Sequence, residues 1–170
     1  MPELTRRISY LVESGHGVLL AGHSHGSVLL AVTVLQLPAR ITRRVALLTY
    51  GSPLRRLYTH LFPVYVDQAV LHEVGQRLGW RWVNLWRDTD QIGSWIFSPH
   101  RPGEPPAVPG PARTVDGRLR DAWDVVAPPN DSVPPPIVGH WPGESDERFG
   151  EAVQELTQRL RAQALRAAPR

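Results

Sequence analysis

The sequence predicts an α/β fold in which a parallel sheet is covered by helices. Three short apolar runs, at residues 18–21, 45–50 and 82–86, have the length and residue types of buried strands. They alternate with segments of helical apolar spacing, and strands that alternate with helices form parallel sheets with right-handed crossovers. The 170 residues, 42% of them hydrophobic, are enough for one compact domain spanning residues 1–170.

The helices are expected between and around these strands. Residues 4–12 place Leu4, Ile8, Leu11 and Val12 on one face, and helical patterns follow at residues 27–32, 64–78 and 144–166. Residues 114–119 contain an Asp-Gly pair typical of a hairpin turn. Two stretches near residues 99–111 and 128–136 are rich in proline and are expected to be extended loops.

The pentapeptide Gly-His-Ser-His-Gly at residues 22–26 lies directly between the first strand and the helix that follows it. A Gly-x-Ser-x-Gly turn of this kind needs little side chain beside the serine, and it exposes the serine hydroxyl in a strained backbone conformation. We therefore interpret Ser24 as a nucleophile and the backbone N–H of His25 as a donor to the oxyanion. The structural alternative is a glycine-rich turn whose serine only caps a helix.

A serine nucleophile needs a base and an acid that orients the base. In enzymes with this turn, the acid and then the histidine follow the serine along the chain. The acid is expected just after the third strand, where Asp88 and Asp90 both stand, and spacing does not separate them. The common alternative for either residue is a solvated turn aspartate.

Seven histidines compete for the role of base. Five of them precede the serine or the acid and are excluded or disfavoured by chain order: His16, His23, His25, His60 and His72. Of the other two, His100 lies in a proline-rich stretch, whereas His140 lies just before the last helix, so we select His140. The alternative for His140 is a loop histidine packed beside Trp141.

Three segments of the chain, residues 22–26, 49–58 and 84–93, resemble the carboxyl-terminal half of lipase class 3-like serine hydrolases of the α/β-hydrolase superfamily, in particular the actinobacterial type. In that family a Gly-Ser-Pro turn follows the strand after the elbow, and the acid stands in a Thr-Asp-x-Ile or Asn-Asp-x-Val context, which favours Asp90 over Asp88. The family histidine precedes a polar and aromatic stretch, to which His140 and Trp141 are similar, although the fuller His-Ser-x-Tyr-Trp form is absent. The resemblance implies a partial α/β-hydrolase fold with a triad of Ser24, Asp90 and His140.

The resemblance covers residues 4–160 but corresponds to only part of the family's domain. Such a fold normally has several strands before the elbow, together with the loop that donates the second oxyanion N–H. Here one amphipathic helix precedes the first strand, which is apolar on both faces and would become an edge of the sheet. We therefore expect a piece of a longer hydrolase, or an oligomer or other assembly in which another chain completes the fold, or an inactive remnant.

Composition excludes several classes of protein. The absence of cysteine removes disulfides, thiol catalysis and thiolate metal sites. No metal or other cofactor is expected, because His72-Glu73 lacks the second histidine of a zinc helix and no phosphate-binding Gly-x-x-x-x-Gly-Lys loop occurs. All 19 basic residues are arginines scattered among acids, and a net charge of +3 does not indicate nucleic-acid binding.

The terminal regions bear on location. No signal peptide or membrane span is visible, which predicts a cytoplasmic protein for the chain as given, with membrane association if the natural chain is longer. Arginines gather in the last helix at positions 159, 161, 166 and 170, which we interpret as a solvated helix end. Attraction to an anionic membrane surface is the alternative, and it would suit an enzyme that acts on lipids.

The sequence thus predicts a lipase- or esterase-like hydrolase of carboxylic esters. His140, oriented by Asp90, would take the proton of Ser24 as the hydroxyl attacks the ester carbonyl of a small-molecule or lipid substrate. The competing hypothesis is an inactive hydrolase remnant that acts as a binding or assembly module. The sequence does not determine the acyl and alcohol parts of the substrate.

Overall fold

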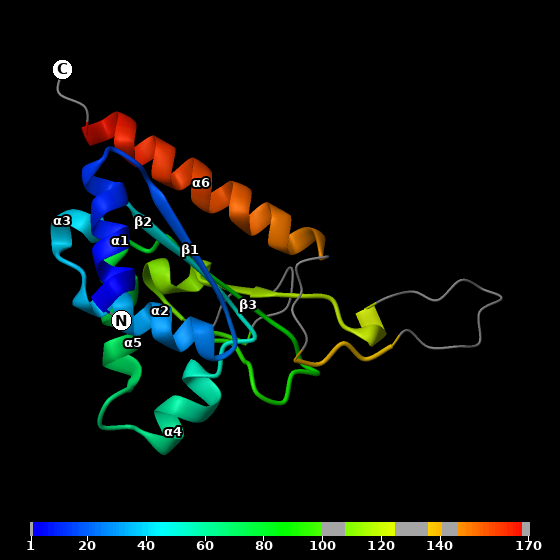
Figure 1. Cartoon of the computed structure of the whole chain (residues 1–170). Coiled ribbons are helices and arrows are strands. Elements are labelled where there is room, and N and C mark those ends of the chain that lie inside the picture. Colours follow the sequence, from blue (N-terminus) through cyan, green and yellow to red (C-terminus); the bar gives the residue numbers. More distant parts are fainter. Residues whose placement is uncertain (1, 100–107, 125–135, 141–145, 168–170) are drawn as a thin grey trace.

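The computed structural model describes residues 2–99, 108–124, 136–140 and 146–167. They form a four-stranded, all-parallel sheet of order β1-β2-β3-β4 with helices packed on both faces (Figure 1), which confirms the predicted α/β class. The strands are β1 (Val18–His23), β2 (Val45–Tyr50), β3 (Trp82–Trp86) and β4 (Asp116–Arg118). The helices are α1 (Pro2–Glu13), α2 (His25–Gln36), α3 (Ala39–Thr42), α4 (Thr59–Leu61), α5 (Gln68–Arg77) and α6 (Glu147–Ala167).

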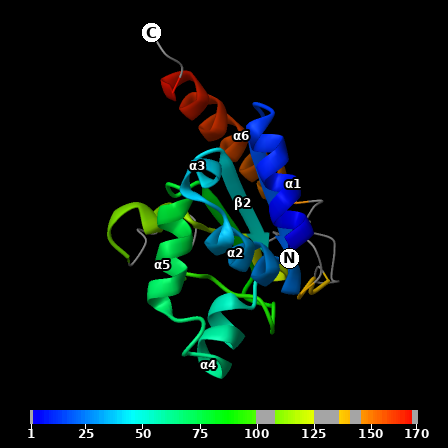
Figure 2. The ribbon, with the colours of Figure 1, turned by 60° about the vertical axis from the view of Figure 1, so that its left-hand side comes forward.

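Alternate side chains of β2 divide the core into two clusters. Val45 and Leu47 pack with apolar residues of α1, α2 and α5, whereas Ala46 and Leu48 pack against α6. Figures 1 and 2 show α6 on one face of the sheet and α1, α2 and α5 on the other. Because both faces are covered, this central strand reads as a continuous apolar run rather than an alternating one.

The first strand lies at an edge of the described sheet, as expected. The N–H of Val18 donates to Arg44 O at 2.9 Å, and that of Ser24 donates to Tyr50 O at 3.0 Å. The backbone N–H and C=O groups of the even-numbered residues of β1 therefore point toward β2. The backbone groups of the odd-numbered residues therefore point away from β2. Among the described residues no strand pairs with that side of β1.

The structure corrects the expected hairpin at residues 114–119. Asp116 and Gly117 belong to β4, which runs parallel to β3 with Asn84 opposite Asp116. Gly117 does not have the positive φ that an Asp-Gly hairpin turn requires. The Asp116 carboxylate accepts backbone N–H groups from residues 96–98 at 2.7 to 2.9 Å, and this tertiary contact holds the segment in the sheet.

A chain of buried polar side chains crosses the sheet from β2 to β4. Trp82 Nε1 donates to Thr49 Oγ1, Thr49 donates to Asn84 Oδ1, and Asn84 Nδ2 donates to Asp116 Oδ1, each at 2.9 Å. Burial raises the pKa of the Asp116 carboxyl, and the N–H donors of residues 96–98 and of Asn84 oppose that rise. This row of hydrogen-bonded side chains joins β2, β3 and β4 to the loop after β3. That loop carries Asp90, the candidate acid.

The segment between β2 and β3 differs from the expected single helix at residues 64–78. A π-helical turn at Leu54–Tyr58 leads into α4, and α5 begins at Gln68, where Asp67 accepts the N–H of Val70 at 2.8 Å and caps the helix. Most of the proline-rich stretches at 99–111 and 128–136 lies outside the described residues. In the part of the chain that is described, no helix has both the length and the apolar character to cross a membrane.

Candidate active site

Ser24 is the single residue between the end of β1 and the start of α2. Its backbone has φ 52° and ψ −125°, a left-handed conformation that is costly for a residue with a side chain. Ser27 Oγ donates to the Ser24 carbonyl at 2.5 Å and lies 2.9 Å from Ser52 Oγ, so the turn is braced from α2 and from the turn after β2. The expected sharp strand-to-helix turn with a strained serine is present.

The two glycines beside the serine are not equivalent. A Cβ on Gly22 would lie 2.9 Å from the carbonyl carbon of Gly26 and 2.7 Å from Leu30 Cδ1, whereas a Cβ on Gly26 would meet nothing within 4 Å. The expectation that both flanking positions must lack side chains is therefore wrong for Gly26. The strand needs Gly22 because it passes against the backbone of the helix.

This asymmetry predicts opposite effects of two alanine substitutions on stability. Gly22→Ala should lower the free energy of unfolding by about 1 to 3 kcal/mol, because the backbone of Gly26 must move. Gly26→Ala should leave it unchanged or raise it by up to about 1 kcal/mol, because alanine favours a helix more than glycine does. Urea unfolding of both variants measures the difference, and equal destabilisation by the two would contradict the prediction.

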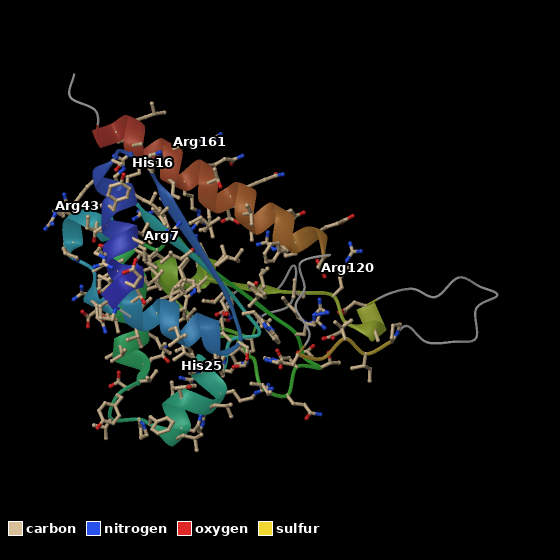
Figure 3. The ribbon with its side chains drawn as sticks, in the orientation of Figure 1. Arg7, His16, His25, Arg43, Arg120 and Arg161 are labelled. Atoms are coloured by element: carbon tan, nitrogen blue, oxygen red, sulfur yellow. The ribbon has the colours of Figure 1, made fainter. Side chains whose placement is uncertain are left out.

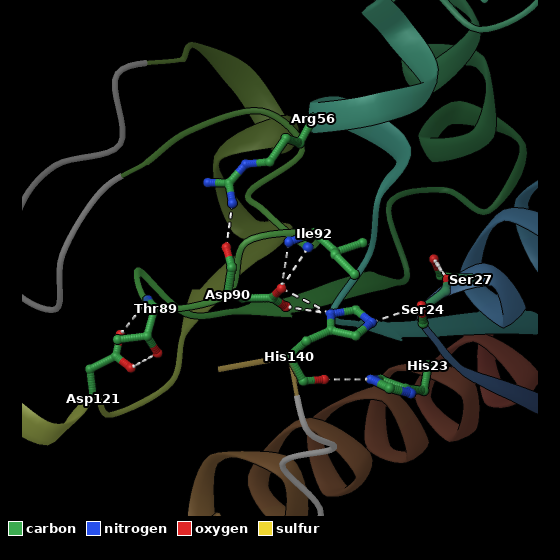
Figure 4. A network of polar contacts seen from close by, with 10 residues as sticks. His23, Ser24, Ser27, Arg56, Thr89, Asp90, Ile92, Asp121 and His140 are labelled. Carbon is green, nitrogen blue, oxygen red and sulfur yellow. Dashed lines mark hydrogen bonds and ion pairs between the residues drawn. The ribbon is translucent and has the colours of Figure 1, made fainter. Parts of the chain in front are cut away.

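His140 lies between Ser24 and Asp90, although these residues are far apart in the sequence (Figure 4). Its Nε2 is 2.8 Å from Ser24 Oγ, and its Nδ1 is 2.9 and 3.0 Å from the two carboxylate oxygens of Asp90. The histidine side chain is 27% exposed and the Asp90 side chain 3%. The structure therefore brings together the three residues predicted as a triad, with the acid enclosed and the serine hydroxyl within reach of the imidazole.

The Asp90 carboxylate is fixed by its own loop. Its Oδ1 accepts the backbone N–H groups of Ile92 and Gly93, each at 2.8 Å, and Arg56 donates to the Asp90 carbonyl (Figure 4). Gly93 must lack a side chain, because its Cβ would lie 2.5 Å from the carbonyl carbon of Gly51. Two backbone donors and a closely packed loop leave the carboxylate one orientation toward His140.

Asp88, the other candidate for the acid, is used elsewhere. Its Oδ2 accepts Arg118 Nε at 2.9 Å and Nη2 at 2.7 Å, and Arg118 also pairs with Asp124 at 2.9 Å. The Arg118 side chain is 4% exposed and the Asp88 side chain 33%, so the pair is enclosed on the arginine side. Spacing alone did not distinguish the two aspartates. In the structure Asp90 contacts His140, whereas Asp88 pairs with Arg118.

His25 lies at the amino-terminal end of α2. Its side chain is exposed, and its Nδ1 lies 3.0 Å from the hydroxyl of Tyr58, in the π-helical turn. Since α2 begins at His25, the N–H groups of its first turn have no acceptor inside the helix, and the helix dipole is positive there. The backbone N–H of His25 thus belongs to the first turn of α2, directly after Ser24, and its role as an oxyanion donor stays a prediction.

His23, which chain order excludes as a base, has a different place in the site. Its Nε2–H donates to the backbone carbonyl of His140 at 2.9 Å, and its ring stacks on Tyr50 with centroids 5.3 Å apart. Gly51 has φ 56°, and a Cβ there would lie 3.0 Å from His23 Nε2 and 3.2 Å from His140 Cε1. The sequence offered one signal for this contact, the position of His23 directly before the serine.

Asp121 also contributes to the site, although nothing in the sequence indicated it. Its carboxylate accepts the N–H of Asp88 at 2.8 Å and the hydroxyl of Thr89, and it is 2% exposed (Figure 4). It therefore fixes the turn that leads to Asp90. His100 and Trp141, which entered the choice of base, lie outside the described residues.

Comparison of the chain with protein-family models, with curated proteins and with solved structures found no match.

Proposed function

We propose that this chain is a serine hydrolase of carboxylic esters, built as a partial α/β-hydrolase domain. The observation that carries the proposal is the relay from Ser24 Oγ through His140 to Asp90, with contacts of 2.8 and 2.9 Å, from a serine held at φ 52°. A nucleophile, a base in hydrogen-bond contact with it and an acid that orients the base are the parts that this chemistry requires.

The geometry supports a sequence of proton transfers. Nδ1–H of His140 donates to Asp90, so Nε2 is free to accept the hydroxyl proton of Ser24. As the proton leaves, Oγ attacks the ester carbonyl, and the imidazolium that forms is stabilised by the Asp90 carboxylate. His140 then returns the proton to the departing alcohol, and a water molecule attacks the acyl-enzyme by the same route in reverse.

An oxyanion would form next to the first turn of α2. The N–H of His25 is the donor that the elbow supplies, and the positive end of the 12-residue helix adds to its effect. Loss of one such donor typically lowers kcat by about 10²- to 10³-fold, so the strength of this hole governs the rate.

The surroundings of Ser24 favour a substrate with an apolar part. The π-helical turn and α4 are anchored to the elbow by the contact between Tyr58 and His25. This segment and the residues directly after it expose several large apolar side chains: Leu57, Leu61, Phe62, Val64 and Tyr65. An acyl chain or an apolar alcohol group bound at Ser24 would find a surface of matching chemistry there.

The proposal is tested by labelling the purified protein with a fluorophosphonate, which reacts with an activated serine and needs no knowledge of the substrate. We expect one label on the wild type, located at Ser24 by mass spectrometry, and no label on Ser24→Ala or His140→Ala. Turnover of p-nitrophenyl esters from acetate to palmitate then gives the preferred acyl length.

The matched control is Ser14→Ala, which removes an exposed serine at the end of α1 and should leave the labelling unchanged. Circular dichroism and thermal unfolding establish that each variant is folded. A folded wild type that takes no label and hydrolyses no ester would refute the proposal and favour the inactive binding or assembly module.

His23 is expected to act as a positioning residue for His140. His23→Phe keeps an aromatic ring beside Tyr50 but removes the N–H that holds the His140 carbonyl. One hydrogen bond is worth about 1 kcal/mol, which corresponds to a loss in kcat of roughly five- to tenfold. The rate of fluorophosphonate labelling should fall in parallel while the midpoint of thermal unfolding changes little, and His16→Phe, at an exposed histidine, is the control.

A further inference from the structure

A cavity of about 680 Å³ lies where the start of β1 meets α6 and the end of α3. Its apolar lining comes from Gly17, Leu19, Leu160 and Ala164. Arg40, Arg43, Arg44 and Arg161 also line it, and Figure 3 shows Arg43 beside α3 and Arg161 on α6. The volume is in the range of small-molecule sites, and the lining combines apolar surface with guanidinium groups.

The arginines around this cavity carry more charge than their surroundings neutralise. Arg40 pairs with Glu13 at 3.2 Å and Arg44 donates to the carbonyl of Gly15 at 2.5 Å. Arg43 and Arg161 have no ion-pair partner among the described residues. Four guanidinium groups beside one carboxylate form a strongly positive site, and a bound anion would relieve their mutual repulsion.

The guanidinium groups of this cavity suit an oxyanion. Guanidinium groups bind the oxygens of phosphates and carboxylates through paired N–H donors. A phosphate or carboxylate group would therefore supply the negative charge that the arginines of this cavity lack.

This cavity is separate from the candidate active site. Leu19 lies near the start of β1 and Ser24 follows its end, so about 16 Å of strand separates them. None of the residues that line the cavity belongs to the candidate triad. The inference below therefore goes beyond the proposed hydrolase activity and does not depend on it.

We propose that the cavity binds an anionic amphiphile, with its phosphate or carboxylate group on the arginines and its alkyl chain on Leu19, Leu160 and Ala164. The charge fixes the anionic end, because Arg43 and Arg161 are free to form bidentate contacts with oxyanions. The apolar side chains of Leu19, Leu160 and Ala164 hold the alkyl chain. A second copy of this chain is a poorer occupant, because symmetric contact would place these arginines against each other.

The test measures binding of dodecyl phosphate, below its micelle-forming concentration, by isothermal titration calorimetry. Dodecanol and inorganic phosphate each lack one half of the proposed chemistry and should bind at least tenfold more weakly. The double variant Arg43→Gln/Arg161→Gln should lose at least tenfold in affinity for dodecyl phosphate. Ala164→Trp, which fills the apolar part of the cavity without a change in charge, should weaken binding to a similar extent.

The matched control is Arg7→Gln/Arg113→Gln, which removes two exposed charges from residues outside the cavity lining and should leave the affinity unchanged. Ser24→Ala should also bind normally, because Ser24 does not line the cavity. Undetectable binding to the wild type, or equal loss in the cavity and control variants, would overturn the proposal.

A second arm distinguishes the source of the amphiphile. Sedimentation with phosphatidylcholine vesicles, with and without one fifth phosphatidate, measures recognition of the same phosphate chemistry in a membrane. Binding to both dissolved dodecyl phosphate and phosphatidate vesicles supports a lipid ligand, and binding to the dissolved form alone supports a free amphiphile. Binding to vesicles alone would overturn the cavity proposal in favour of general attraction to an anionic surface.

Discussion

Asp90→Asn should lower kcat for p-nitrophenyl ester hydrolysis by about 10⁴-fold, because an amide in place of the carboxylate favours the wrong tautomer of the histidine. In the wild type both carboxylate oxygens lie within 3.0 Å of His140 Nδ1, and Oδ1 also accepts two backbone N–H groups. The side-chain oxygen of an asparagine would be taken by these donors, which would turn the NH₂ group toward the histidine. Nδ1 would then have to accept, and Nε2 would carry the proton and could no longer serve as a base.

The control for this prediction is Asp88→Asn, two residues away. Arg118 keeps Asp124 as a partner in that variant, so we expect some loss of stability and an unchanged kcat per folded molecule. The concentration of folded protein, from circular dichroism and thermal unfolding, normalises each rate. If Asp88→Asn lost activity and Asp90→Asn retained it, the assignment of the acid would be reversed.

Asp116→Ala should have the largest effect on stability. The substitution leaves the N–H groups of residues 96–98 and the amide of Asn84 without their acceptor in a buried region. An unsatisfied buried polar group costs about 1 to 3 kcal/mol, and with several affected we expect a loss of about 4 kcal/mol or more. At roughly 2 to 4 °C for each kcal/mol in a chain of this size, the midpoint of thermal unfolding should fall by about 8 to 16 °C.

Asp67→Ala serves as the comparison, because the Asp67 carboxylate accepts one exposed N–H at the start of α5. Loss of such a cap costs about 1 kcal/mol. Calorimetric unfolding of the two variants should therefore differ severalfold in the shift of the midpoint. Equal shifts would show that the Asp116 carboxylate is not the anchor of the loop after β3.

The sequence was sufficient to predict the elements whose pattern is local. β2 and β3 occur at the expected residues because their runs are mostly apolar and of strand length. The strand at Asp116–Arg118 was missed, since it has three residues, none of them apolar, and its conformation depends on donors at residues 96–98. The π-helical turn before α4 has no sequence signal of comparable strength.

The residues of the candidate site likewise fall into those that a local pattern predicts and those that depend on tertiary contacts. Ser24 could be predicted from a pentapeptide, because the elbow is a local structure with a steric signature. The choice between Asp88 and Asp90 depends on where Arg118 lies, and the contact of His23 with the His140 carbonyl depends on how two distant segments meet. Such contacts are set by tertiary packing and could not be read from spacing.

The separation of Ser24 and His140 by 116 residues has a kinetic consequence. Closing a loop of that length costs on the order of 4 kcal/mol of chain entropy, which the sheet and α6 must offset before serine and imidazole meet. While the chain is being synthesised, the elbow can form early, but it has no base until residue 140 has emerged. In a refolding experiment the labelling of Ser24 should therefore recover later than the helical signal, so that a fluorophosphonate would also report when these two distant segments meet.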